Sequence, residues 1–295
     1  MSEPVMSETV IKETKRKNPW AEVFRRLKKN RLAMIGLFVV IVLAFTAIFA
    51  DFIAPYTYEE QDLMAAFESP SATHWFGTDE FGRDIFSRIV YGSRISLQVG
   101  FVAVSFSILI GGFLGALAGY YGGWIDNVIM RFMDVLFSVP QLLLAISVAA
   151  SLGPGLFNLM IAVGISSVPQ YARLVRASVL SIREQEFIEA ARSVGAKDLK
   201  IIFRHILPNC MAPIIVQGTL GVAFAILTAA GLSFIGLGIQ PPIPEWGAML
   251  SGGREYIRDY AYMTMFPGLA IMITILALNF LGDGLRDALD PKLKN

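Results

Sequence analysis

Long apolar stretches alternate with shorter polar segments along almost the whole chain. An α-helix advances about 1.5 Å per residue, so about 20 apolar residues cross the hydrocarbon core of a bilayer. We therefore predict an all-α, polytopic membrane protein with six transmembrane helices. The predicted spans are 32–50, 95–121, 135–152, 156–170 with a continuation to 180, 211–239 and 262–281.

The composition supports a membrane protein over a large soluble α-helical one. Of the 295 residues, 55% are hydrophobic and only 17% are charged, whereas soluble domains carry roughly a quarter charged residues. A single cysteine, Cys210, provides no disulfide framework, and with two distant histidines the chain offers no metal cluster. We predict no metal site and no bound cofactor.

The first 31 residues are polar and basic, and they precede the first apolar stretch. This basic region is too long for a signal peptide, so we predict that span 32–50 is retained. Trp20 and Phe24 are expected on a helix that lies on the membrane surface before it. The predicted organisation is a basic segment 1–31, a first span, a polar segment 51–94, a five-helix domain 95–284 and a tail 285–295.

The distribution of lysine and arginine predicts the orientation. Six spans place both termini on one side, and 20 of the 25 lysines and arginines fall on that side. Basic residues accumulate in cytoplasmic segments of membrane proteins. We therefore predict cytoplasmic N- and C-termini, a cytoplasmic segment 181–209 and an extracytoplasmic segment 51–94.

Two details concern the spans themselves. Gly111, Gly115 and Gly119 recur every four residues, which lets another helix approach closely. Arg131 and Asp134 are costly inside a bilayer, so we start the third span at residue 135 and expect the two charges to pair with each other at the interface.

Segment 51–94 has eight acidic residues and three arginines. It could form a lid or a contact surface, or it could be a solvated loop followed by a membrane-surface helix, Ile85–Tyr91. His74, beside Trp75, is expected to be an interfacial loop residue and not a metal ligand.

Segment 181–209 reads as two short amphipathic helices joined at Gly195. Ser181 and Glu184 have the spacing of a capping box, and Gly195 can adopt the left-handed conformation that ends a helix. Pro208 is expected to stop the second helix. The two predicted apolar faces are Phe187, Ala190 or Ala191 and Val194, and then Leu199, Ile202, Phe203 and Ile206.

The predicted span cores contain no Asp, Glu, Lys, Arg or His. An ion-coupled secondary transporter usually needs such groups near the midplane, so that class remains only an alternative. The motifs of intramembrane enzymes and the phosphate-binding loop G-x-x-x-x-G-K-[ST] are also missing from the sequence. We therefore predict a non-enzymatic membrane protein that draws energy from a separate partner.

The motif Glu189-Ala190-Ala191, three residues, Gly195 and then Leu207-Pro208 resembles the EAA motif of permease subunits in ABC importers. His205 stands where the general pattern has isoleucine, and Ile206 follows it. The run 205–209 is similar to the dipeptide, oligopeptide and nickel branch. Segments 77–84, 119–126 and 282–287 resemble the C-type subunit of that branch.

This resemblance implies an importer in the plasma (inner) membrane of a prokaryote, moving dipeptides or oligopeptides by alternating access. Nickel or a small solute such as glutathione is the alternative. The implied partners are a second related permease, two cytoplasmic ATPases that use ATP and Mg, and an extracytoplasmic solute-binding protein, with no nucleic acid. The residues implied to contact the ATPase are Phe187, Glu189, Ala190, Ala191, Gly195, Ile206, Leu207 and Pro208.

Three polar residues lie within otherwise apolar spans: Gln141, Gln217 and Asn279. Polar groups inside a bilayer need partners. They could line the solute pathway, or they could form hydrogen bonds between helices.

Overall fold

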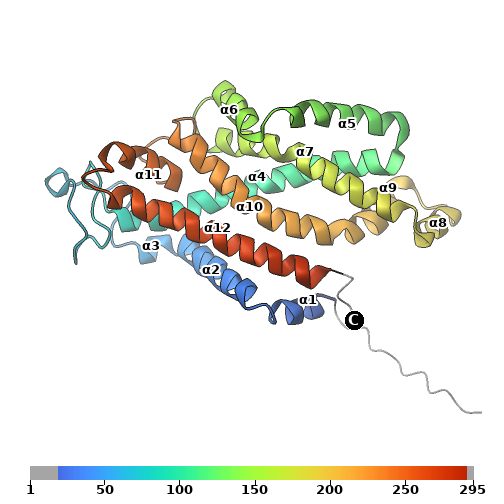
Figure 1. Cartoon of the computed structure of the whole chain (residues 1–295), viewed down its shortest axis with the longest axis horizontal. Helices are drawn as coiled ribbons and strands as arrows, with labels where there is room; N and C mark the ends of the chain where they lie inside the picture. The colour runs from blue at the N-terminus through green and yellow to red at the C-terminus, as the bar shows by residue number, and fades with distance from the viewer. Residues whose placement is uncertain (1–18, 291–295) are drawn as a thin grey trace, which may run out of the picture.

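A computed structural model describes residues 19–290, a bundle of long helices with short helices at both ends (Figure 1). The all-α prediction is confirmed. Residues 1–18 of the predicted basic segment and residues 291–295 of the predicted tail lie outside the described range. The helices are α1 (Pro19–Leu27), α2 (Arg31–Ile48), α3 (Ala50–Ile53), α4 (Ile85–Tyr121), α5 (Gly123–Ser138), α6 (Gln141–Leu152), α7 (Leu156–Arg183), α8 (Glu186–Ser193), α9 (Asp198–Ile201), α10 (Met211–Phe234), α11 (Trp246–Gly253) and α12 (Tyr262–Leu289).

The structure does not confirm the predicted number of six spans. Within the described residues, four helical segments are long and apolar enough to cross a membrane: α2, α4, the run Asp198–Phe234 and α12. The bent pair α5–α6 gives a fifth when it is counted as one span. The count of six is therefore not confirmed. The predicted fourth span lies in α7, whose arginines and polar residues lower its mean hydropathy.

The predicted third span, 135–152, is not a single straight helix. The chain bends by 91° between α5 and α6, and Val139 there has extended backbone angles. The bend lies at Pro140, which has no N–H to donate and disfavours a helical conformation in the residue before it. The charged turn around Arg131 is thus part of α5, which starts at Gly123.

The predicted surface helix Ile85–Tyr91 is also not separate. It forms the first turns of α4, a continuous helix of 37 residues. Asp84 caps this helix, since its Oδ2 accepts a hydrogen bond from the Ser87 N–H at 2.7 Å. The second span therefore begins ten residues earlier than predicted.

α4 and α7 pack against each other through the glycine row, as predicted. A Cβ at Gly111 would lie 2.5 Å from the Val168 carbonyl oxygen, and one at Gly115 would overlap the Ala172 carbonyl. Small residues at these positions allow the close approach of two backbones, which maximises van der Waals contact where lipid provides no hydrophobic driving force.

The two ends of the bundle differ in content (Figure 1). One end carries α8 and α9, and we call it the loop end. The other carries residues 51–84 and α11, and we define residues 51–94 together with 240–261 as the cap.

Candidate functional site

The segment that carries the EAA-like motif begins later than predicted. α7 continues to Arg183, so Ser181 lies in its last turn and cannot cap the next helix. α8 starts at Glu186, and Gln185 before it makes no side-chain cap. The predicted capping box is therefore wrong, because Ser181 already belongs to a long helix whose packing extends to this point.

α8 is anchored by a residue that the predicted face did not include. Ile188 is fully buried, with an exposed fraction of 0%, and it packs in a cluster with Val179, Ile201 and Ile202. The predicted face points outward: Phe187 is 41% and Val194 is 85% exposed. Ala190 and Glu189 are also exposed, while Ala191 is half-buried. An apolar ridge with one carboxylate thus faces away from the bundle.

Gly195 ends α8 in the predicted left-handed conformation, with φ of +76°. Its N–H donates to the Arg192 carbonyl at 2.9 Å, and the Ala196 N–H donates to the Ala191 carbonyl at 3.1 Å. These two bonds form the Schellman motif, which satisfies carbonyls at a helix end and favours glycine at this position. The angle between α8 and α9 is therefore set at this residue.

Pro208 does not stop the second helix. α9 passes through a π-helical turn, η2 (Ile202–Ile206), and a 3-10 turn, η3 (Leu207–Cys210), directly into α10. In the π turn the Leu207 N–H donates to the Ile202 carbonyl. Such widened turns accommodate the missing donor and the ring of a proline, so the loop is continuous with the span that follows it.

The second predicted face is divided between the interior and the surface. Ile202 and Ile206 are buried, whereas Leu199 and Phe203 are 59% and 57% exposed. Of the remaining predicted coupling residues, Leu207 is half-buried and Pro208 is exposed.

Polar contacts join the loop end to the end of α4. Tyr120 donates its hydroxyl to Asp198 Oδ1 at 2.7 Å, and the Arg192 guanidinium lies 5.3 Å from the Tyr120 ring centroid. Arg183 donates to the Gly119 carbonyl at 2.9 Å. α8 and α9 are thus tied to α4 as well as to α7.

The predicted pair between Arg131 and Asp134 does not form. Asp134 instead accepts a hydrogen bond from Arg173 of α7 at 2.7 Å, because α5 packs along α7. Asp126 likewise receives two hydrogen bonds from Arg176, both 2.6 Å long. Bidentate arginine–carboxylate pairs are among the stronger ion pairs, and they neutralise charges close to the apolar region.

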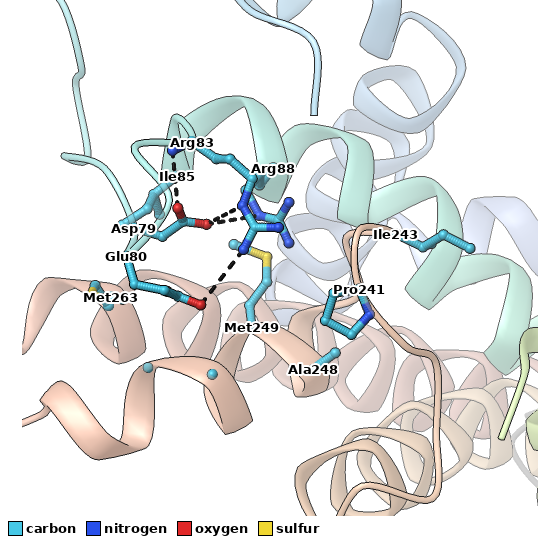
Figure 2. A pocket seen from close by; sticks show the side chains of 12 residues that line it. Asp79, Glu80, Arg83, Ile85, Arg88, Pro241, Ile243, Ala248, Met249 and Met263 are labelled. Atoms are coloured by element: carbon cyan, nitrogen blue, oxygen red, sulfur yellow. Dashed lines mark hydrogen bonds and ion pairs between the residues drawn. The ribbon is translucent and has the colours of Figure 1, made fainter. Parts of the chain in front are cut away.

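At the opposite end, the cap is built around Asp79 (Figure 2). Asp79 is 6% exposed and accepts a 2.6 Å hydrogen bond from Arg83 Nε. Arg88 Nε lies 3.6 Å from the same carboxylate, and Glu80 lies 3.7 Å from Arg83. This is a buried ionic network, so a solvated loop does not describe residues 79–88, whereas most residues of 51–75 are exposed.

Arg88 also joins the two halves of the cap. Its Nη1 donates to the Tyr58 carbonyl at 3.0 Å and to the Pro242 carbonyl at 3.2 Å. Trp246 is buried and donates its indole N–H to the Ile89 carbonyl at 3.1 Å. The two polar segments therefore fold as one unit.

Two carboxylates of the cap have raised pKa values. Burial raises the pKa of Glu80 above its ordinary value. Burial also raises the pKa of Glu245, although the backbone N–H groups of Gly247 and Ala248 donate to its two oxygens.

His74 is a loop residue of the cap, as predicted. Its Nδ1 lies 3.0 Å from Asp84 Oδ1, and its ring stacks on Tyr56 at 5.0 Å. Among residues 19–290, no group of three or more His, Cys, Asp and Glu side chains is placed to hold a metal ion.

Two of the three predicted pathway residues lie together. Gln141 and Gln217 line a cavity of about 230 Å³ between α6, α7 and α10. Gln141 donates to Ser167 Oγ at 2.8 Å, so here the alternative of a helix-to-helix hydrogen bond is also realised. Asn279 lies on α12 and does not line this cavity.

Comparison with known families decides which kind of membrane protein this is. Residues 111–295 match the family described as "Binding-protein-dependent transport system inner membrane component". The chain belongs to this permease family. Residues 18–70 match the "N-terminal TM domain of oligopeptide transport permease C". The predicted ABC importer permease of the peptide and nickel branch, a multi-pass protein of the inner membrane that works with ATPase subunits, is thereby confirmed.

Curated relatives resemble the permease over nearly its whole length. The dipeptide transport system permease protein DppC of Alkalihalophilus pseudofirmus is 54% identical over 94% of this chain and 91% of its own. The glutathione transport system permease protein GsiD of Escherichia coli O157:H7 is 51% identical over 97% of this chain and 94% of its own.

Solved structures support the fold of the permease. A chain of the MetNI methionine ABC transporter, in inward-facing conformations, matches with a TM-score of 0.56 at 20% identity, over 69% of this chain and 96% of that one. An amino acid ABC transporter crystallised with histidines gives 0.53 at 18% identity, over 68% and 94%.

The sequence interpretation missed two groups of residues in the permease. The buried cap residues Asp79, Arg83 and Arg88 sit in a segment whose charge suggested solvent exposure. Gln170, which lines the cavity of Gln141 and Gln217, lies at the end of an apolar run. Gln170 lies three residues after Ser167 and on the same helix face, and this spacing is the sequence feature that could have identified it.

Proposed function

We propose that this permease imports dipeptides, in a complex with a second related permease and two ATPases, and that α8 docks on one ATPase. The exposed ridge of Phe187 and Val194, held from below by fully buried Ile188, is the observation that carries this proposal. An apolar helix face supported by a buried anchor and open to solvent suits a partner protein.

The orientation follows from charge. The loop end carries most of the basic side chains, and basic residues favour the cytoplasm. The termini and α8 are then cytoplasmic, ATP and Mg are used in the ATPase subunits, and the cap faces an extracytoplasmic solute-binding protein. The cap contains aromatic surface residues such as Trp75, which is 56% exposed.

The choice of solute rests on the relatives. A dipeptide permease at 54% identity favours dipeptides, and a glutathione permease at 51% makes glutathione the second candidate. Uptake of radiolabelled dialanine, with glutathione and nickel as competitors, distinguishes these solutes.

The mechanism is alternating access driven by the ATPases. ATP can shift the equilibrium between inward- and outward-facing states only through its different affinity for the two states. The loop must therefore transmit motion stiffly. Its direct continuation into α10 and its tie to α4 through Tyr120 and Asp198 support that role.

The test uses the whole complex in proteoliposomes. Glu189→Lys and Gly195→Pro should abolish ATP-dependent uptake while both permeases still assemble. Glu184→Lys is the matched control, because it makes the same charge change outside α8. Normal uptake in both variants would overturn the docking role. Loss of uptake on collapse of an ion gradient, with ATP held constant, would favour a secondary transporter instead.

A further inference from the structure

Two cavities of the bundle are neighbours. The cavity of about 230 Å³ that holds Gln141 and Gln170 shares Gln217 and Leu220 with a second one of about 370 Å³. The second cavity is lined by Leu174, Arg286 and Asp290. We refer to these two neighbouring cavities together as the cleft, which lies along α7, α10 and α12, from the middle of α7 to the C-terminal end of α12. That end of α12 points toward the loop end (Figure 1).

The smaller of the two cavities, of about 230 Å³, is polar but uncharged. None of the eight residues that line it carries a charge. Gln170 is exposed and Gln217 half-buried, and among the described residues neither side chain makes a hydrogen bond. Lipid cannot satisfy an amide group, so these side chains must face water or another polar partner. The volume is large enough for several water molecules.

We infer that this cleft is the chain's own share of the solute pathway, and that Gln170 and Gln217 contact the backbone amides of a passing peptide. The inference rests on the proposed function. Each glutamine offers two N–H donors and an oxygen acceptor, which match the C=O and N–H groups of a peptide bond. Because none of the residues that line the smaller cavity is charged, this part of the cleft does not discriminate between cationic and anionic peptide side chains.

Shape favours a water-filled pathway over a contact with the second permease. A packed protein interface is close to crystal density, with few voids larger than a water molecule. Here the surface is hollowed by two neighbouring cavities of about 230 and about 370 Å³, and the larger one lies beside Arg286 at the loop-side end of α12. A pathway that opens toward the loop end is the arrangement of an inward-facing permease.

Cysteine labelling tests the location of the pathway. In the assembled complex with Cys210→Ala, cysteines at Gln170 and Leu220 should react with a membrane-impermeant thiol reagent added from the loop side. A cysteine at Ile41 should not react, because this residue is 57% exposed on the peripheral helix α2 and lines neither cavity. Unreactive Gln170 and Leu220 positions would overturn the inference.

Selectivity for charged peptides tests the chemistry of the smaller cavity. Wild-type complex should take up Ala-Lys and Ala-Glu at rates that differ less than about threefold, apart from the preference of the binding protein. Gln217→Glu should shift the ratio by about tenfold toward Ala-Lys, because a carboxylate in a narrow cleft attracts the cation and repels the anion. Gln217→Lys should shift it the other way.

An unchanged ratio in both variants would overturn the contact of Gln217 with solute. The failure of the proposed function gives a different result, since wild-type complex would then take up neither dipeptide while the labelling pattern could still be read.

Discussion

The cap and the loop end handle their charges in opposite ways. In the cap, Asp79, Arg83 and Arg88 are 4–6% exposed and bind one another. At the loop end, the charged residues of α8 are exposed, and so is the apolar ridge of Phe187 and Val194. The cap buries a network of charges, whereas the loop end leaves its charges exposed beside an apolar ridge. One region is built for rigidity, and the other has the properties of a docking surface.

The bonds of the two regions also differ in reach. Arg88 and Pro242 are 154 residues apart, and Trp246 and Ile89 are 157 apart. The contact of Tyr120 with Asp198 spans 78 residues. The bonds of the cap thus join segment 51–94 to segment 240–261, which lies much later in the chain. Damage to it should destabilise the whole fold, while damage to the loop end should affect coupling more than stability.

Arg88→Ala should have the largest effect on stability. It leaves the Asp79 carboxylate buried with a weaker set of partners and deprives the Tyr58 and Pro242 carbonyls of a donor. Breaking a buried ion pair typically costs about 3–5 kcal/mol. Thermal unfolding in nanodiscs, followed by tryptophan fluorescence, should show a large fall in the midpoint.

Arg258→Ala is the control for this prediction. Arg258 is also in the cap, but it is exposed, so its removal should leave the unfolding midpoint unchanged. Equal midpoints for Arg88→Ala and the wild type would show that the ionic network does not hold the cap together.

Gly195→Ala should show whether the loop end affects the coupling of ATP hydrolysis to uptake beyond its effect on stability. Gly195 has φ of +76° with open space around it, and Gly236 has φ of +85° with the same open space. Alanine at either position should cost about 1–2 kcal/mol, because an L-residue is strained in the left-handed region. Only Gly195→Ala changes the angle between α8 and α9, so only this variant should uncouple ATP hydrolysis from uptake.

Gly236→Ala thus provides a matched strain outside the loop end. If both variants reduced the ratio of peptide transported to ATP hydrolysed by the same factor, the effect would come from general destabilisation, and the loop end would lose its special role.

The comparison also explains what the sequence could predict. The apolar runs located most helices, and Gly195 revealed its own backbone conformation, because both signals are local. The role of Pro140 was missed, since hydropathy alone does not report a bend. One partner of Arg88, the Pro242 carbonyl, lies 154 residues away in the chain, so the sequence did not show that Asp79, Arg83 and Arg88 are buried.

The candidate site shows the same limit. The motif located α8, but it did not identify Ile188 as the residue that anchors this helix, because that depends on which face meets α7 and α9. Gln141 and Gln217 were identified because amides stand out in apolar runs. Their meeting with Gln170 requires the packing of α7 on α10, which a single sequence does not specify.

Tyr120→Phe should produce a smaller, local effect at the loop end. It removes the hydroxyl that donates to Asp198, and a hydrogen bond to a charged group contributes about 1.5–3 kcal/mol where it is buried and less at a partly exposed site. We expect a two- to threefold fall in coupled uptake, which corresponds to about 0.5 kcal/mol, with an unchanged cap.

Asp198→Asn should give a similar fall, because it weakens the same bond from the other side. Tyr121→Phe is the control, since the neighbouring Tyr121 is 43% exposed and makes no contact with Asp198 in the described structure. A fall of equal size in the control would mean that the loop is not held through Tyr120.

Glu80→Gln should have the smallest effect, and its sign depends on pH. Burial raises the folded-state pKa of Glu80 above the ordinary value of 4.5, so the native cap holds this proton more tightly than the unfolded chain does. The stability that this group contributes is present below pH 4.5 and is lost as pH rises through the raised pKa. The glutamine variant does not titrate. Its unfolding midpoint relative to the wild type should therefore rise between about pH 4 and pH 7.

Asp79→Asn tests the neighbouring carboxylate, which binds Arg83 directly, and should lower the midpoint at neutral pH. If Glu80→Gln lowered it as much as Asp79→Asn, the attraction of Glu80 to Arg83 would outweigh its burial, and the network of the cap would depend on both carboxylates.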